Sequence, residues 1–180
     1  MPGDGERGIG HGSGRRRSRG RRESTLEGAR GAAYKLLAVQ ARTEAELRQA
    51  LSVRGYSQDH VEQAMAEMIS RGYINDHVTA RRWAGYAAQE QRHGVGGIAL
   101  RLVRRGIDHD LARAAAAEAY ESEGIDEREA ALSLARKRIT AADAADDESR
   151  QRACRRVAGF LERRGFRADA IAHAISELFT

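Results

Sequence analysis

One pattern, repeated around three glycines, constrains the fold of this 180-residue chain more than any other feature. Each glycine follows an arginine and precedes a large apolar residue. Apolar residues also lie four and eight positions before it and six, ten and thirteen positions after it. Such spacings place side chains on one face of a helix, and glycine lets the chain reverse without the steric cost of a Cβ. The sequence therefore predicts a helix–glycine–helix corner made three times, at Gly55, Gly106 and Gly165.

A further helix precedes each corner, which predicts three-helix units. With starts at Thr25, Asn75 and Asp126, the third unit carries about eight more residues before its glycine than the first two, around the segment AADAADDES. Tandem units of this size stack into a linear array in which each touches its neighbours. We predict an all-α fold of three tandem three-helix repeats in an elongated array, with repeats over 25–72, 73–122 and 123–180.

Local signals place the individual helices. The only proline is Pro2, so no later residue imposes a proline break. Two capping boxes are predicted, one from Ser24 to Glu27 and one from Thr43 to Glu46. The expected helices cover 25–41, 43–54, 57–70, 75–92, 95–105, 108–121, 126–140, 147–164 and 167–179.

Residues 1–24 differ from the rest of the chain. Up to residue 25, seven arginines face three carboxylates, whereas the remaining 155 residues sum to about +1 of the total charge of +5. A Gly- and Arg-rich segment with so few apolar residues cannot offset chain entropy, so we expect a disordered tail. Its arginines either bind nucleic-acid phosphates or only solubilise the chain. The candidate nucleic-acid contacts are Arg15, Arg16, Arg17, Arg19, Arg21 and Arg22.

Several functional classes lack support in the sequence. No apolar run is long enough for a membrane span, and the N-terminus has no apolar signal region. Cys154 is the single cysteine, no histidine pair has the spacing of a helical zinc site, and no phosphate-binding P-loop occurs. We therefore expect a monomeric cytoplasmic protein that is no enzyme and needs no cofactor.

The arginine before each glycine allows two interpretations. A cation in the last turn of a helix complements the helix dipole. The alternative is a basic edge for binding, which requires that the three units present these side chains in the same way.

The segment 71–107 is the most specific part of the chain. Its run Gly72-Tyr73-Ile74-Asn75-Asp76, then Ala80, Trp83, Arg92-x-Gly94, Ile98, Leu102 and Gly106-Ile107, resembles the RecX family of recombination regulators. Arg42-Thr43-x-x-Glu46-Leu47 and Phe160-Leu161-x-x-Arg164-Gly165-Phe166 are similar to the same family, so the resemblance extends over 29–178. It implies a curved array in which Asn75 and Asp76 act as caps and the apolar motif residues form the core: Tyr73, Ile74, Ala80, Trp83, Ile98, Leu102 and Ile107.

The resemblance also implies a partner. Proteins of this family bind the RecA recombinase, chiefly its filament on DNA, and restrain its ATPase, strand-exchange and co-protease activities. We expect the contacts among basic residues on helix surfaces. The candidates are Arg81, Arg82, Arg92, Arg101, Arg104, Arg105, Lys137, Arg138, Arg155, Arg156, Arg163 and Arg164.

Two other functions remain open at this point. The glycine corners could be turns of helix-turn-helix motifs, although the helices that follow them carry few base-reading side chains. The array could also be a scaffold for another protein. Weak, salt-sensitive DNA binding is compatible with each of these functions.

Overall fold

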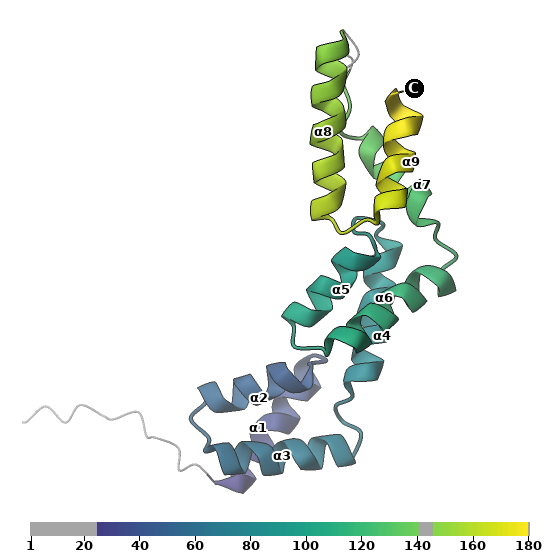
Figure 1. Ribbon diagram of the computed structural model, residues 1–180. Coiled ribbons are helices and arrows are strands. Elements are labelled where there is room, and N and C mark those ends of the chain that lie inside the picture. Colours follow the sequence, from purple (N-terminus) through teal and green to yellow (C-terminus); the bar gives the residue numbers. More distant parts are fainter. Residues whose placement is uncertain (1–24, 141–145, 180) are drawn as a thin grey trace, which may run out of the picture.

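A computed structural model describes residues 25–140 and 146–179, and in this part of the chain it contains nine helices and no strand (Figure 1). The predicted all-α fold is confirmed. Two predicted helices end earlier than expected, at Gln89 and Arg136 instead of 92 and 140. The helices are α1 (Leu26–Val39), α2 (Glu44–Val53), α3 (Gln58–Ser70), α4 (Asp76–Gln89), α5 (Val95–Arg104), α6 (His109–Ser122), α7 (Glu127–Arg136), α8 (Asp147–Arg163) and α9 (Ala168–Phe179).

Side chains cap most of the helix starts. The capping box of Thr43 and Glu46 is confirmed, since each side chain bonds the other residue's backbone N–H. The box predicted from Ser24 to Glu27 is wrong: Thr25 is the N-cap of α1 and accepts from the N–H of Gly28. Asn75 caps α4 as expected.

The three glycines form the predicted corners. Gly55, Gly106 and Gly165 have φ angles of 86°, 86° and 72°, in the left-handed region that favours glycine. Each corner joins the second helix of a unit to the third, namely α2 to α3, α5 to α6 and α8 to α9.

Each group of three consecutive helices encloses its own hydrophobic core. The first core is rich in Leu and Met, the second consists largely of alanine from α4 and α6, and the third combines Ala, Leu, Ile and Phe. Two predicted core residues differ. Tyr73 is 55% exposed, with its ring edge-on to Tyr34, and Trp83 is only partly buried against the second core. Tyr73 therefore lies at the surface, whereas its neighbour Ile74 is buried in the first core.

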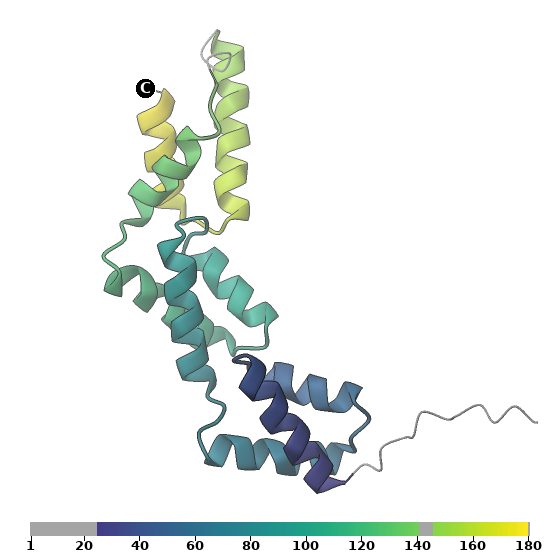
Figure 2. The same ribbon diagram turned by 180° about the vertical axis from the view of Figure 1, so that it is seen from behind.

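The units follow one another along an elongated molecule (Figures 1 and 2), and the first two meet at the N-terminus of α2. The hydroxyl of Thr43 donates to the carbonyl of Arg105 over 2.7 Å. The side chain of Arg105 contacts both carboxylate oxygens of Glu46, at 2.8 and 3.3 Å. Asp76, which was predicted to cap α4, instead accepts the N–H of Glu44 at the start of α2.

The second and third units meet in the same way at the N-terminus of α5. The N–H of Gly94 donates to the carbonyl of Arg164, and that of Gly96 donates to the carbonyl of Gly165, both over 3.0 Å. Glu127, 5% exposed, accepts the N–H of Val95, as Asp76 does for Glu44 at the first junction. One repeated contact therefore builds the array: the corner of a unit packs on the second helix of the unit before it.

Candidate partner-binding surface

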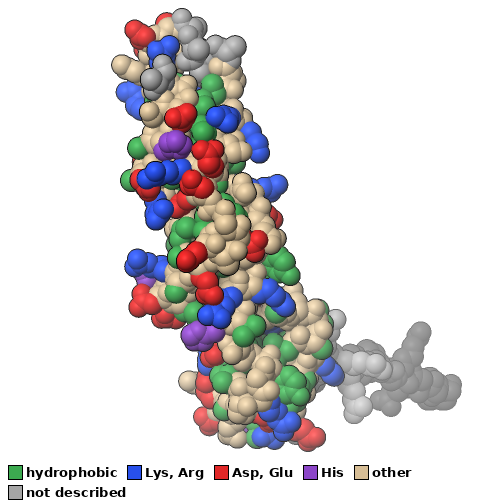
Figure 3. Space-filling view, turned by 90° about the vertical axis from the view of Figure 1, so that its right-hand side faces the viewer, with side chains coloured by type: hydrophobic (Ala, Val, Ile, Leu, Met, Phe, Trp, Pro, Cys, Tyr) green, Lys and Arg blue, Asp and Glu red, His purple; other side chains and the backbone are tan. Residues whose placement is uncertain are grey.

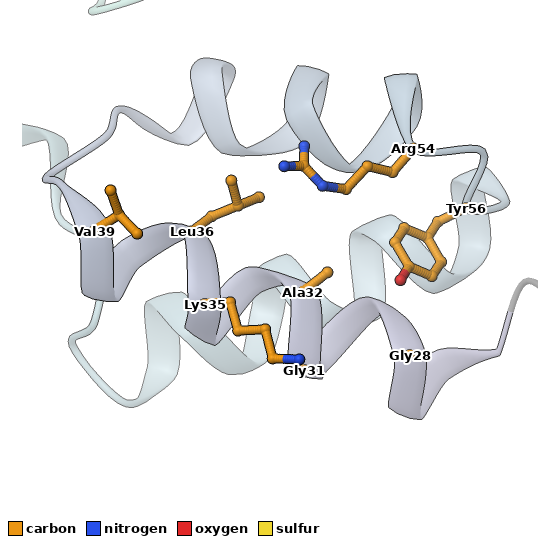
Figure 4. A pocket seen from close by; sticks show the side chains of 8 residues that line it. All are labelled: Gly28, Gly31, Ala32, Lys35, Leu36, Val39, Arg54 and Tyr56. Atoms are coloured by element: carbon orange, nitrogen blue, oxygen red, sulfur yellow. The ribbon is translucent and has the colours of Figure 1, made fainter. Parts of the chain in front are cut away.

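Each unit carries a surface groove between its first and second helices. In the first unit α1 and α2 form the walls, and Figure 4 shows the Arg54 side chain running back along α2 above Leu36 and Ala32 of α1. Its guanidinium donates to the carbonyl of Ala50 over 2.8 Å. The groove is lined by Gly28, Gly31, Ala32, Lys35, Leu36, Val39, Arg54 and Tyr56.

The groove of the second unit uses equivalent positions. Five of its residues lie 51 positions after residues that line the first groove; Arg105, for example, corresponds to Arg54. The lining residues are Trp83, Tyr86, Ala87, Glu90, Ile98, Arg101, Leu102 and Arg105.

The groove of the third unit has more cations, and residues 89–92 of the second unit, at the end of α4 and in the loop after it, complete its lining. Its corner arginine, Arg164, is the counterpart of Arg54 and Arg105. Lys137, the C-cap of α7, lines this groove as Lys35 of α1 lines the first one. The lining residues are Gln89, Glu90, Gln91, Arg92, Ser133, Leu134, Lys137, Arg138, Phe160 and Arg164.

In the third groove two arginine side chains lie over one aromatic ring. The guanidinium carbons of Arg138 and Arg164 lie 4.3 and 5.1 Å from the centre of the Phe160 ring. Arg164 also donates to the carbonyl of Arg92 over 3.2 Å. A guanidinium over a ring face keeps donors free for another group, so this groove can bind carboxylates or phosphates.

In the second groove the corner arginine is already engaged. The Arg105 guanidinium carbon lies 3.2 Å from the centre of the Trp83 ring, and its nitrogens contact Glu46. This arginine therefore joins two units, and its donors are less available to a partner than those of Arg138.

His93 lies beside these grooves, and its Nδ1 is 3.3 Å from a guanidinium nitrogen of Arg101. Burial lowers the pKa of His93, and the nearby cations Arg101, Arg164 and Arg92 lower it further, whereas Glu90 raises it. The carbonyl of His93 also accepts a 2.6 Å hydrogen bond from the Tyr120 hydroxyl. Its imidazole is therefore neutral around pH 7 and can accept from Arg101.

Burial, and next the Glu127 carboxylate, raise the pKa of Tyr120 to about 12. The hydroxyl therefore stays protonated at neutral pH and keeps donating to the carbonyl of His93. This hydrogen bond holds the loop before α5 onto α6.

The structure divides the twelve predicted contact residues into two sets. Six line the second and third grooves: Arg92, Arg101, Arg105, Lys137, Arg138 and Arg164. The other six lie outside these grooves. Arg81 and Arg82 line a hollow between α4 and α6, where Arg81 pairs with Glu118 over 3.1 Å. Arg104, Arg155, Arg156 and Arg163 are exposed on α5 and α8.

Charged side chains of both signs are mixed on the surface of the molecule. On the face shown in Figure 3, Lys and Arg side chains alternate with Asp and Glu side chains along the molecule. The six arginines of the tail predicted to contact nucleic acid lie outside the described residues. Within the described ranges, no group of histidine, cysteine or acidic residues could hold a metal ion. No helix of 25–140 or 146–179 is long and apolar enough to cross a membrane.

The sequence analysis did not predict the first groove or the role of the Phe160 ring in the third groove. The predicted contact residues do not include Lys35 and Arg54, although Arg54 belongs to the repeated arginine–glycine pair. Phe160 lies 59 positions after Arg101, the spacing that relates Gly106 to Gly165. A repeat alignment extended to surface positions would have identified these residues.

These features define an all-helical tandem-repeat protein with a groove in every unit. The family model for the first three-helix domain of RecX matches residues 29–68. The curated "Regulatory protein RecX" of Amycolatopsis mediterranei is 33% identical over 149 residues, covering 80% of this chain and 79% of its own length. That of Trichlorobacter lovleyi is 36% identical over 142 residues, covering 78% of this chain and 88% of its own.

The chain therefore belongs to the RecX family of regulatory proteins. Solved structures agree with the fold. The crystal structure of RecX from Lactobacillus salivarius superimposes with a TM-score of 0.69 at 22% identity, covering 85% of this chain and 96% of that one. A second crystal structure of regulatory protein RecX gives a TM-score of 0.68 at 20% identity, covering 84% of this chain and 73% of that one.

Proposed function

We propose that this protein binds the RecA filament on DNA and inhibits its ATPase, strand-exchange and co-protease activities. The carrying observation is the row of three similar grooves, one per unit, each with its corner arginine and two with a lysine from the first helix or its C-cap. A filament repeats the same surface along its axis. A linear array of similar grooves is suited to contact successive protomers.

The mechanism that follows is non-enzymatic. Several weak contacts on one rigid array combine into strong binding, because each contact after the first is intramolecular. A protein that spans neighbouring protomers in one conformation favours that conformation of the filament. It thereby slows the changes between protomers that ATP hydrolysis and strand exchange require, without adding chemistry of its own.

The test is RecA ATP hydrolysis on single-stranded DNA, titrated with wild type and with the double variant Lys137→Glu, Arg138→Glu. Both residues are exposed in the third groove, so the variant should fold but inhibit at least about tenfold more weakly, because interfacial charge reversal costs several kcal/mol. Arg113→Glu on α6, exposed and outside the three grooves, is the control and should inhibit like wild type.

Two results would contradict this proposal. Equal inhibition by the wild type and the double variant would exclude the third groove from the interface. Absence of both inhibition and filament binding with the wild type would exclude RecA as the partner and favour a scaffold for another protein.

The tail supports a second contact, with DNA. Six arginines between Arg15 and Arg22 can neutralise phosphates. Deleting residues 1–23 should then flatten the salt dependence of DNA binding and leave the melting midpoint of the helical part unchanged. An unchanged salt dependence would indicate a solubilising role only.

A further inference from the structure

Two of the three repeat corners are occupied by the N-terminus of a helix from the preceding unit. A Cβ placed on Gly106 would overlap the Cβ of Ala45, at the start of α2. A Cβ placed on Gly165 would overlap the backbone of Gly97, at the start of α5. Both corners therefore accept a helix start at distances that only glycine on the corner allows.

The two docked helix starts share their chemistry. The residue before each helix, Thr43 or Gly94, donates a hydrogen bond to the carbonyl of the corner arginine. The second helical residue is small, Ala45 or Gly96, and packs on the corner glycine. At the first junction the third helical residue, Glu46, also pairs with the corner arginine.

The corner of the first unit has the same structure and no occupant among the described residues. Gly55 has the same φ of 86° as Gly106, yet a Cβ added there would meet no described atom within 4 Å. Arg54 occupies the position of Arg105, but its guanidinium donates to the carbonyl of Ala50 and not to a carboxylate. Val53 beside it is 80% exposed, where the other units have Arg104 and Arg163. Within the described residues, the first corner therefore lacks both the docked helix start and the carboxylate partner of the corner at Gly106.

The third unit of another copy does not offer the matching helix start. Glu44 begins α2 and Val95 begins α5, each 11 residues before its corner glycine. α8 begins at Asp147, 18 residues before Gly165, so Ala153, the position equivalent to the N-caps Thr43 and Gly94, is buried within the helix. Among the described residues, the third unit of another copy therefore has no helix start that could dock on the corner at Gly55. This corner requires a different partner.

We infer that the Arg54–Gly55 corner binds the N-terminus of an α-helix on a protein partner. The chemistry of the filled corners defines that helix: Ser, Thr or Gly at its N-cap, Ala or Gly at its second position and Glu at its third. The N-cap donates to the carbonyl of Arg54, the small residue packs on Gly55, and the Glu pairs with the Arg54 guanidinium. The inference rests on the proposed function in taking the RecA filament as that partner.

The variant Gly55→Asn tests the corner. Asn tolerates a positive φ, and its side chain enters open space in the free protein, but it would overlap a docked helix as a Cβ on Gly106 overlaps Ala45. Gly72→Asn is the matched control, because Gly72 has φ 70° and open space but is not a repeat corner.

The probe is an acetylated peptide copying residues 43–54, held helical by a covalent link between positions 49 and 53. Backbone amide shifts of the full-length protein should concentrate at residues 53–56 in wild type and in Gly72→Asn. Binding should be at least about tenfold weaker in Gly55→Asn and for a peptide carrying Ala45→Ile. Equal binding by Gly55→Asn, or shifts centred elsewhere or absent at millimolar peptide, would overturn the inference.

Two further measurements separate the possible occupants. RecA filament binding should fall at least about tenfold in Gly55→Asn and stay unchanged in Gly72→Asn; equal binding by both variants overturns the assignment to the filament. If wild type binds no filament, the proposed function fails, and the peptide result alone decides the corner. A dimer in sedimentation that Gly55→Asn abolishes would identify a second copy as the occupant and also overturn the inference.

Discussion

The Thr43 hydroxyl donates a 2.7 Å hydrogen bond to the carbonyl of Arg105, 62 residues further along the chain. The same oxygen accepts the N–H of Glu46, so one buried side chain both caps α2 and joins the first two units. At the second junction the backbone N–H of Gly94 takes over the bond to the arginine carbonyl. Because Gly94 has no side chain, the start of α5 can lie close to the corner at Gly165.

Thr43→Val should therefore destabilise the junction of the first two units. Valine has nearly the same shape but no hydroxyl, so the carbonyl of Arg105 loses its donor and the N–H of Glu46 loses its acceptor. We expect a loss of about 1–3 kcal/mol in the free energy of unfolding, measured by urea denaturation. Thr43→Ser keeps the hydroxyl and is the control; a loss as large in Thr43→Ser would show that the methyl group, not the hydroxyl, stabilises this site.

Gly97→Ala should be strongly unfavourable, although alanine is the better helix former. A Cβ on Gly97 would overlap the carbonyl of Arg164, which belongs to the backbone and cannot rotate away. Overpacking of this kind costs about 1–3 kcal/mol, measured as the urea midpoint. Gly31→Ala is the contrast, since nothing lies within 4 Å of its Cβ, and it should stabilise by about 0.5–1 kcal/mol. A stable Gly97→Ala variant would mean that the third unit can shift on the second.

Glu127→Gln should weaken the junction of the second and third units. One Glu127 oxygen accepts the N–H groups of Val95 and Arg167, each over 3.2 Å, and the other lies 2.8 Å from the Arg167 side chain. An amide keeps one acceptor but loses the charge, so we expect about 1–3 kcal/mol of destabilisation. Glu129→Gln on the same helix, 66% exposed, should change stability by less than about 0.5 kcal/mol. Equal effects of the two substitutions would contradict the role of Glu127.

The repeat and its corners could be predicted from sequence because they depend on local physics. Helical spacing of apolar residues and a left-handed glycine are visible in the residues themselves, so all nine helices were placed. The junctions were not predicted, because Asp76 and Glu127 read as ordinary acidic residues at helix starts. Their role in capping the preceding unit appears only when the units are stacked.

The binding surface was predicted only in part for a related reason. The sequence predicts contacts among basic residues on helix surfaces, and this criterion includes Arg155 and Arg156 on the long α8 outside the grooves. It cannot distinguish Arg104 from Arg105, although only Arg105 contacts both an aromatic ring and a carboxylate. The groove position of Lys35 was missed because it is a single cation without a basic neighbour.

Arg104→Ala and Arg105→Ala should differ in their effect on the free energy of unfolding. Arg105 stacks on Trp83 and pairs with Glu46, so its loss should cost about 1–2 kcal/mol and change the fluorescence of the single tryptophan. Arg104 is exposed with no contact described in the structure, and its loss should cost less than about 0.5 kcal/mol. Charge reversal of both residues together would therefore confuse a folding defect with a binding defect. Equal stability of the two alanine variants would show that the Trp83 and Glu46 contacts contribute little.

Mild acid should destabilise the junction of the second and third units through His93. Burial and the cations Arg101, Arg164 and Arg92 hold its pKa below the ordinary value of 6.5 in the folded chain. The unfolded chain therefore binds more protons as pH falls through 6.5 towards the lower folded pKa, and the free energy of unfolding decreases over that window. Urea midpoints measured from about pH 7.5 to about pH 5.5 should fall in wild type. His93→Gln can still accept from Arg101 but cannot become charged, so its midpoint should fall less; an equal fall in both proteins would assign the acid sensitivity to other groups.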